Sequence, residues 1–525
     1  MEEFAPHRLV ALLEERFRAL EVEFNRAYWD SQVAATAEND RRRAELELEL
    51  RRAKGDPDSL RSVEAALDED LHEPLLRRQL EILRLSLMSN RMDDSMREEL
   101  VQISSSVESD FATHRPQVDG KHLNENEITD ILRASEDESL RRSAWEASKE
   151  IGGVVAPRVR ELARLRNGVA IALGYSDYYT MGLDLQELNE EWLLGILDEV
   201  EQLTEGPFFK YKDALDERLR ERFGVAQLMP WHYADPFFQA LPPDGRISLD
   251  RAFADKSAVD LARRTFSAWD IDLAGVMDAS DLYPRENKSQ HAFCIDVDRS
   301  GADVRILANI VAGERWVEVM LHESGHAAYD VSIDPDLPYL MRRPSHTFVT
   351  EAIAMLSGDL ERDPRWLVDI AGLPPPDVAR VDEHLHSAHV AQRLVFARWA
   401  LVVIHFERGL YLDPEADLDA RWWELVERFQ GIEASAGRAA PDWASKVHVA
   451  AAPVYYQNYL LGDMLASQLR RTCARECGGL VGVPAAGELL RERIFKHGSV
   501  MKWDALVEAA TGEPLSARAL AGELG

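Results

Sequence analysis

Two histidines four residues apart, in the stretch HESGH at residues 322–326, have the spacing of a metal site on a helix. Residues at positions i and i+4 lie on one helical face, so His322 and His326 can offer imidazole nitrogens to the same ion. Glu323, beside the first histidine, could take a proton from a water molecule. Neutral imidazole binds zinc well, and a catalytic zinc site keeps one position open for water. The motif therefore predicts a catalytic zinc site, with a chance arrangement in a long helical protein as the alternative.

The flanking residues are typical of a buried helix. Trp316, Val317, Met320 and Leu321 supply an apolar face beside the motif. Gly325 costs a helix about 1 kcal/mol relative to alanine. Its presence indicates that another stretch of backbone packs closely against this helix.

A third protein ligand is expected from the next helix, because catalytic zinc sites commonly use three. The segment TFVTEAIAMLSGDL, residues 347–360, has a helical pattern and places Glu351 among apolar neighbours. An unpaired buried charge is costly, so this carboxylate needs a partner. We expect the partner to be zinc, and an arginine such as Arg342 or Arg343 is the alternative.

Most of the remaining sequence also has helical periodicity. Residues 291–310 differ, because two β-type runs flank a turn that contains glycine, which predicts a short strand pair just before HESGH. We find no repeat of 20–50 residues and no low-complexity linker. We therefore predict a mainly α protein in which residues 1–525 form one large domain with a cleft and one small β unit next to the zinc helix.

Charge and cysteine content exclude several classes of protein. The chain has 61 Lys+Arg against 93 Asp+Glu, a net charge of −32, so neither nucleic acid nor an anionic membrane is expected as a partner. The start, MEEFAPHRLV, lacks the pattern of a signal peptide, and the longest apolar run is too short to span a bilayer. Three cysteines cannot form a disulfide framework, which favours the reducing cytoplasm.

With these motifs the sequence resembles the angiotensin-converting enzyme (peptidyl-dipeptidase A) family of gluzincin zinc peptidases, and thimet-type oligopeptidases have a related layout. The likeness covers about residues 260–470, and it extends more loosely through RLRNGVAIALGYSDYYTM and FNRAYW. The 24 residues between His326 and Glu351 are typical of this clan. The resemblance implies one zinc ion per chain, short peptides as substrates and a deep central cleft. Residues 1–260 would include the helices that cover the cleft, and residues 261–525 would form the catalytic half.

Two further segments carry the resemblance. SQHAFC is similar to the active-site strand of the family, so His291 would hydrogen-bond the substrate and the backbone of Ala292 would pair with an extended peptide. KVHVAAAPVYYQNY is similar to the Lys-x-His stretch that precedes two tyrosines three residues apart. By this likeness His448 and Tyr459 would stabilise the oxyanion that forms when an amide carbonyl is attacked.

The same stretch would bind the C-terminal carboxylate of the substrate through Lys446 and Tyr456. The gap from histidine to tyrosine is one residue longer than in the animal converting enzymes, which leaves Tyr455 as an alternative to Tyr456. Asn458 stands where those enzymes carry an arginine tied to chloride activation, so chloride dependence is not implied. The nearest candidate for a glutamine that helps to bind the carboxylate lies in WHYADPFFQ, residues 231–239.

The expected function is that of a cytoplasmic zinc peptidase that releases dipeptides from the C-terminus of short peptides, with Glu323 as general base. One alternative is an endo-acting oligopeptidase of the thimet type, which needs no free carboxylate. The alternative from another class is a catalytically inert peptide-binding protein with a zinc site.

Overall fold

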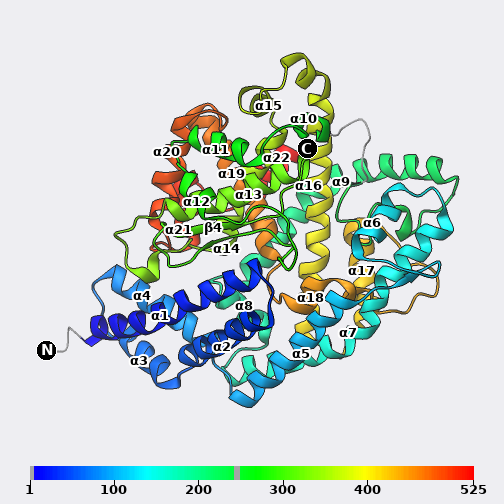
Figure 1. Ribbon diagram of the computed structural model, residues 1–525. Helices are drawn as coiled ribbons and strands as arrows, with labels where there is room; N and C mark the ends of the chain where they lie inside the picture. The colour runs from blue at the N-terminus through cyan, green and yellow to red at the C-terminus, as the bar shows by residue number, and fades with distance from the viewer. Residues whose placement is uncertain (1–4, 242–248) are drawn as a thin grey trace. The chain divides into compact units, whose positions relative to one another are not determined.

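Helices form most of the protein, as the sequence predicts (Figure 1). The computed structural model describes residues 5–241 and 249–525. Within these ranges the strands form two antiparallel pairs, β1 with β2 and β3 with β4. None of the helices in these ranges combines the length and the hydrophobicity that a membrane span requires.

The chain divides into two compact units, each assembled from three separate segments. The first unit contains Met1–Arg91, Ser248–Asp382 and Leu461–Leu515, and the second contains Met92–Ile247, Glu383–Leu460 and Ser516–Gly525. The expected single domain with halves 1–260 and 261–525 stays a prediction, as does the cleft.

The first unit contains the HESGH helix, α13, and the helix that follows it, α14. Its elements are α1 (Ala5–Val33), α2 (Ala37–Lys54), α3 (Pro57–Leu67), α4 (Pro74–Met88), α10 (Asp250–Phe253), α11 (Ala258–Ser267), α12 (Ala274–Ala279), β3 (Phe293–Asp296), β4 (Val304–Leu307), α13 (Glu314–Val331), η2 (Tyr339–Met341), α14 (Thr347–Gly358), η3 (Asp359–Arg362), α15 (Pro364–Asp369), α20 (Pro484–Arg493), η5 (Phe495–His497), α21 (Trp503–Thr511), the start of α16 (Pro375–Leu412) and most of α19 (Gln457–Cys477).

Helices α13 and α14 pack directly against each other. A Cβ atom at Gly325 would lie 2.8 Å from the Cα of Ala354, so only glycine allows this approach. The close backbone neighbour predicted for Gly325 is therefore confirmed.

Strands β3 and β4 form the predicted hairpin beside α13, with Phe293 opposite Leu307 and Asp296 opposite Val304. Gly301, with φ of 71°, lies in the connecting turn, where its left-handed backbone suits glycine. In the described part of the chain no strand pairs with the outer edge of β3.

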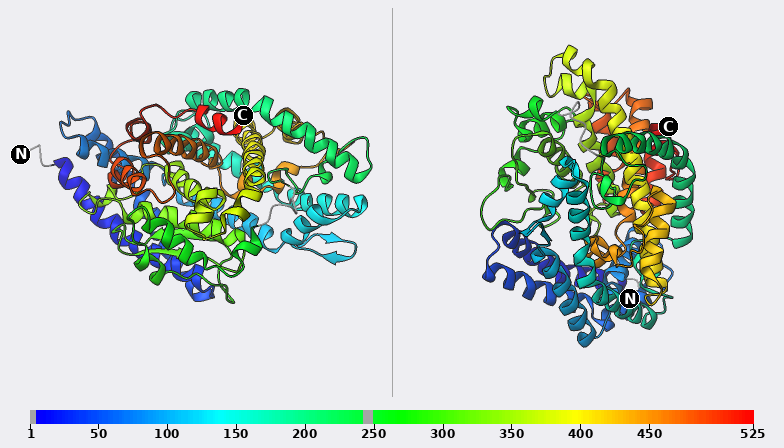
Figure 2. Two further views of the ribbon diagram at one scale, coloured as in Figure 1. Left: turned by 90° about the horizontal axis from the view of Figure 1, so that it is seen from above. Right: turned by 90° about the vertical axis from the view of Figure 1, so that its right-hand side faces the viewer.

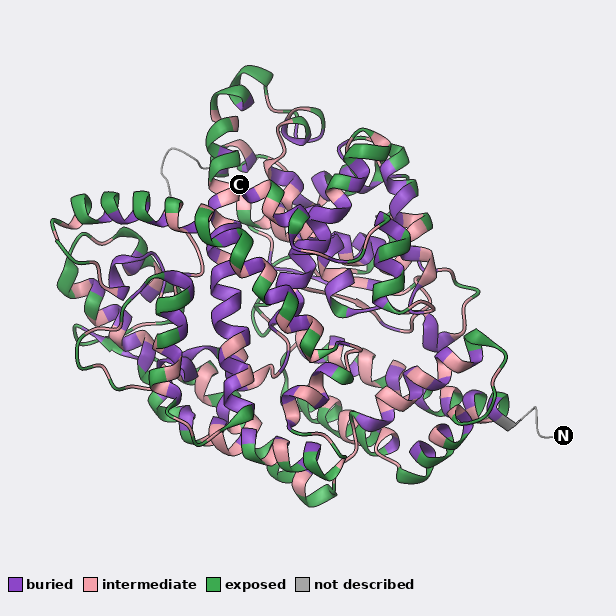
Figure 3. Cartoon of the chain, turned by 180° about the vertical axis from the view of Figure 1, so that it is seen from behind, coloured by how far each residue is buried: buried purple, intermediate pink, exposed green. Residues whose placement is uncertain are grey.

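The second unit is built around long helices, several of which have one buried and one exposed face, as the purple and green sides of the ribbons show (Figure 3). From residue 391 to residue 411, α16 (Pro375–Leu412) is instead buried on nearly all sides. Its small β1–β2 hairpin is visible as the cyan arrows in the left view of Figure 2. Its elements are α5 (Asp94–Thr113), β1 (Gln117–Val118), β2 (Lys121–His122), α6 (Glu125–Ala134), α7 (Glu138–Ala172), α8 (Tyr178–Asp184), α9 (Glu190–Phe223), η1 (Pro230–His232), α17 (Leu418–Gln430), η4 (Asp442–Ser445), α18 (Val447–Ala451), α22 (Arg518–Leu524), most of α16 and the start of α19.

Candidate functional site

The three predicted metal ligands lie together in the first unit. His322 and His326 come from α13 and Glu351 comes from α14. The Nε2 atoms of the two histidines are 3.7 Å and 3.9 Å from Oε2 of Glu351, and one ligand atom from each residue lies within 4.8 Å of the others. Donors that share one tetrahedral ion at zinc–ligand distances of about 2 Å are themselves about 3.4 Å apart. These three residues therefore fit a zinc ion.

Both histidines are in the protonation state that a metal requires. Burial lowers the pKa of His322 to about 4, although the carboxylate of Asp359 opposes the shift. Burial also lowers the pKa of His326 to about 3, and His322 adds to the decrease. Both rings are therefore neutral near pH 7, and each has a nitrogen lone pair for an ion.

Thr350 holds the other side of the His326 ring. Its Oγ1 lies 2.7 Å from Nδ1 of His326. When Nε2 faces a metal, Nδ1 carries the proton and donates it to this hydroxyl oxygen. The contact fixes both the tautomer and the orientation of the ring.

Glu323 is buried on the same helix as the two histidines. Burial raises its pKa to about 8, with further contributions from the carboxylates of Glu351 and Glu318. The backbone N–H of Cys294, in β3, donates a hydrogen bond to Glu323 and partly offsets the increase. The hairpin therefore contacts the proposed general base.

The strand residues expected to bind substrate precede β3. His291 is exposed and Ala292 is half-buried, and they lie immediately before Phe293, where the strand begins. The outer edge of β3 offers backbone groups to which an extended peptide can add as a further strand.

A second cluster lies in the second unit, around Lys446. Nζ of Lys446 donates a hydrogen bond to Oε1 of Gln239 at 2.7 Å. The same nitrogen lies 5.9 Å from the centre of the Tyr456 ring. The residue pair joins the end of WHYADPFFQ to the start of the KVHV stretch, two segments more than 200 residues apart. Gln239 is the single glutamine of the stretch that the sequence offers as the nearest candidate for carboxylate binding.

The tyrosines pack around His448. The ring centroids of His448 and Tyr456 are 5.3 Å apart, and those of His448 and Tyr459 are 6.2 Å apart. Nε1 of Trp399 donates a hydrogen bond to the hydroxyl oxygen of Tyr456 at 2.6 Å, which leaves the hydroxyl proton for another acceptor. The ring of Tyr455 instead contacts Tyr459.

His448 is neutral, and one of its nitrogens has no partner. Burial lowers the pKa of His448 to about 4, and the positive charge of Lys446 adds to the decrease. Its Nδ1 has no hydrogen-bond partner among the described residues. A buried nitrogen without a partner is costly in the folded protein, so a substrate group is a suitable partner for it.

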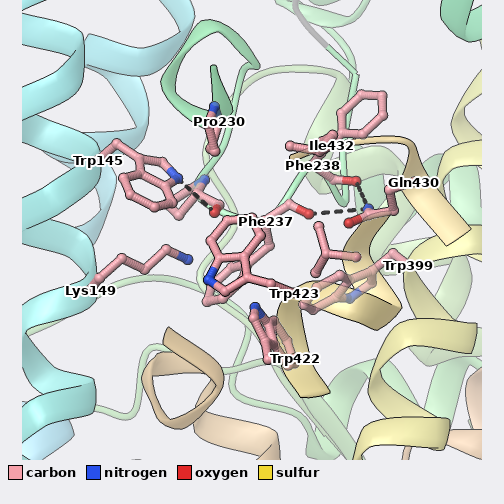
Figure 4. A pocket seen from close by; sticks show the side chains of 12 residues that line it. Trp145, Lys149, Pro230, Phe237, Phe238, Trp399, Trp422, Trp423, Gln430 and Ile432 are labelled. Atoms are coloured by element: carbon pink, nitrogen blue, oxygen red, sulfur yellow. Dashed lines mark hydrogen bonds between the residues drawn. The ribbon is translucent and has the colours of Figure 1, made fainter. Parts of the chain in front are cut away.

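The segment that ends at Gln239 lines an aromatic pocket, shown in Figure 4, and hydrogen bonds hold it in place. Nε2 of Gln430 donates hydrogen bonds to the carbonyl oxygens of Phe238 at 2.8 Å and Phe237 at 3.2 Å. Oδ2 of Asp235 accepts a hydrogen bond from the backbone N–H of Gln239 at 3.0 Å. Lys149 points into this pocket, and its Nζ lies 3.3 Å from the centre of the Phe237 ring.

Comparison with protein families matches most of the chain and leaves residues 207–278 outside both matches. Residues 2–206 match the model of the angiotensin-converting enzyme family, and residues 279–525 match the model of peptidase family M3. A search of curated proteins gives no match. The chain is a zinc metallopeptidase of the gluzincin type.

Each of the two family models matches a different part of the peptidase sequence. The half that contains HESGH and the tyrosines matches family M3, whereas the N-terminal helices match the converting enzymes. Both families act on peptides, so the zinc peptidase hydrolyses peptides. The donor set of two neutral histidines and one glutamate suits the zinc that such peptidases use.

Sequence reasoning missed Thr350 in the first unit, and it did not predict that Gln239 lies against Lys446 in the second unit. Gln239 is far from Lys446 in sequence, and only the fold brings the two side chains together. Thr350 immediately precedes Glu351, so the general rule that metal-binding histidines hydrogen-bond a further polar group could have prompted a search for it.

Proposed function

We propose that this zinc peptidase releases dipeptides from the C-terminus of short peptides. The observation that carries the proposal is the hydrogen bond between buried Lys446 and half-buried Gln239, beside Tyr456. An ammonium group, an amide and a phenol together offer the donors that a terminal carboxylate needs. A site of this kind holds the end of a peptide and thereby sets which bond is cut.

In this proposal His322, His326 and Glu351 hold the zinc ion. Bound zinc polarises the scissile carbonyl and lowers the pKa of water from about 15.7 towards about 7. Glu323 takes a proton from the attacking water and later gives it to the leaving amine. Its burial beside the metal ligands supports this role, because a general base must lie close to the proton that it removes.

His448 and Tyr459 are proposed to stabilise the oxyanion. The contact between their rings and the unpartnered Nδ1 of His448 support this role. Removing one such donor typically lowers the rate by about 10²–10³-fold. His291 and the backbone of Ala292 are proposed to align the peptide along the outer edge of β3.

Tyr456 is the better candidate than Tyr455 for the carboxylate. Tyr456 is buried and lies against both Lys446 and His448, whereas Tyr455 is only half-buried. We therefore assign carboxylate binding to Lys446, Gln239 and Tyr456.

The test compares one peptide with a free C-terminus and the same peptide with an amidated C-terminus, with products identified by mass spectrometry. Dipeptide release predicts that the free peptide loses its last two residues and that the amide is cut much more slowly. Equal cleavage of both peptides at internal bonds would contradict the proposal. It would support the second candidate, an endo-acting oligopeptidase of the thimet type, which needs no free carboxylate.

A further inference from the structure

Val454, two residues before Tyr456, has a backbone conformation that its side chain disfavours. Its φ is 52°, in the left-handed region that β-branched residues rarely adopt. Val454 lies between the end of α18 at Ala451 and the start of α19 at Gln457. A strained residue persists only where its surroundings hold it, and such residues concentrate at functional sites.

Three hydrogen bonds hold the main chain of Val454. Its N–H donates to Oε1 of Glu407 at 2.7 Å, and its carbonyl oxygen accepts from Nε2 of Gln186 and of Gln457, each at 2.8 Å. Its side chain packs against α8, where a Cβ atom at Gly182 would lie 2.9 Å from Cγ2 of Val454. Both polar backbone groups and the side chain of Val454 are therefore fixed.

Glu407 is a buried carboxylate that serves this contact. It is 2% exposed on α16. Across the residues that the structure describes, its carboxylate accepts one hydrogen bond, from Val454, and forms no ion pair. Burial raises the pKa of Glu407 to about 7, although the hydrogen bond from Val454 and the charge of Arg166 oppose the increase. A buried acid is unfavourable unless it is hydrogen-bonded, so the N–H of Val454 stabilises Glu407 in this position.

Gln186 extends the same network to the next helix. Its Oε1 accepts a hydrogen bond from Nδ2 of Asn458 at 3.0 Å, in the first turn of α19. Its Nε2 also donates to the carbonyl oxygen of Gly182 at 2.9 Å, which ties it to α8. Asn458 directly precedes Tyr459, so the network spans both proposed tyrosines.

We propose that Glu407 and Gln186 are positioning residues that hold Val454 in its left-handed conformation and thereby orient Tyr456 and Tyr459 towards His448. This inference rests on the proposed roles of the two tyrosines.

The experiment replaces Glu407 by leucine, which removes the acceptor, and by glutamine, which keeps an oxygen in the same place. Folding is checked by circular dichroism and thermal unfolding, and kcat and KM are measured for a free-acid peptide and its amide. Glu407→Leu should lower kcat/KM for the free acid by about 10²-fold, because small displacements of catalytic groups have effects of this size. The same variant should reduce the preference for acid over amide, and Glu407→Gln should remain close to the wild type.

A second substitution isolates the backbone effect. Glycine adopts a positive φ without strain, so adding Val454→Gly to Glu407→Leu should restore kcat/KM at least about tenfold. If Glu407→Leu does not fold, Gln186→Leu replaces it in the same pair of measurements, because Gln186 is only half-buried. Loss of activity without rescue by Val454→Gly would overturn the inference, and so would folded variants with wild-type kcat, KM and acid preference. If the wild type itself shows no preference for the free acid, dipeptide release is contradicted. The positioning role of Glu407 and Gln186 is then judged only from kcat of the variants relative to the wild type.

Discussion

Replacing Lys446 by methionine should abolish the preference for peptides with a free C-terminal carboxylate. Lys446 is 9% exposed, and its Nζ lies 2.7 Å from Oε1 of Gln239. A hydrogen bond to a charged group contributes about 1.5–3 kcal/mol. The substitution should therefore raise KM for the free acid by about 10–150-fold and leave KM for the amide nearly unchanged.

The pH dependence of the wild type provides a sharper test of the same residue. Burial lowers the pKa of Lys446 to about 8, and the carboxylates of Asp235 and Glu125 oppose the decrease. In the proposed role, the ammonium form of Lys446 binds the substrate carboxylate, so this contribution should be present below pH 8 and should be lost as the pH rises through this value. The ratio of kcat/KM for acid over amide should fall about tenfold per pH unit above pH 8, since kcat/KM reports on the free enzyme.

The assay measures this ratio from about pH 6 to about pH 10, so that ionisations common to both peptides cancel. Lys149→Met is the matched control, because Nζ of Lys149 also lies over the Phe237 ring, whereas the hydrogen bond to Gln239 among the described residues comes from Lys446. The control should keep the wild-type profile, and Lys446→Met should give a low and flat ratio. A wild-type ratio that does not change with pH, or a high ratio in Lys446→Met, would refute the reasoning.

Three further substitutions test other parts of the molecule. Glu323→Gln should retain zinc but cleave peptides about 10²–10⁴-fold more slowly. Zinc analysis and a peptide assay on the same sample check this, and a variant that cleaves at the wild-type rate would exclude Glu323 as the base. Thr350→Val should weaken zinc binding about 10–100-fold, whereas Thr350→Ser should preserve it. Competition with a chelator measures the zinc affinity of each variant, and equal affinities in the two variants would argue against the contact with His326. Lys149→Met should stabilise the fold by about 1–4 kcal/mol near pH 7, because burial lowers the pKa of Lys149 from 10.5 to about 7. Between pH 7 and pH 10.5 the unfolded chain binds this proton and the folded chain does not, so the stability of the wild type should rise with pH in this range. The stabilisation that Lys149→Met gives relative to the wild type should therefore shrink over the same range. Urea unfolding of the wild type and of Lys149→Met at about pH 6.5 and about pH 10 measures the difference in stability. The same difference at the two pH values would contradict this prediction.

Local patterns in the sequence were sufficient to predict the helical fold and the three side chains that lie together as candidate metal ligands. The spacing of His322 and His326 depends only on helix geometry, and Gly325 indicated the close packing that Ala354 provides. The strand pair before α13 was visible from its alternation and its turn.

The site around Lys446 was less predictable, because it depends on contacts between distant segments. No local pattern relates Gln239 to Lys446, and no residue propensity would place Val454 at a positive φ. The choice between Tyr455 and Tyr456 depends on which ring packs against His448, and the spacing in the sequence does not show this. Tertiary packing determines such positions, and it overrides local preference at functional sites.

The central claim is that His322, His326 and Glu351 bind one zinc ion. Its most direct test is a zinc titration of the wild type and of Glu351→Ala, with metal content and affinity measured on the same folded samples. We predict about one tightly bound zinc per wild-type chain and an affinity at least about 10²-fold weaker in Glu351→Ala, because the variant loses one of three protein ligands. Equal affinity in the two proteins, or a wild type that binds no zinc, would contradict the claim.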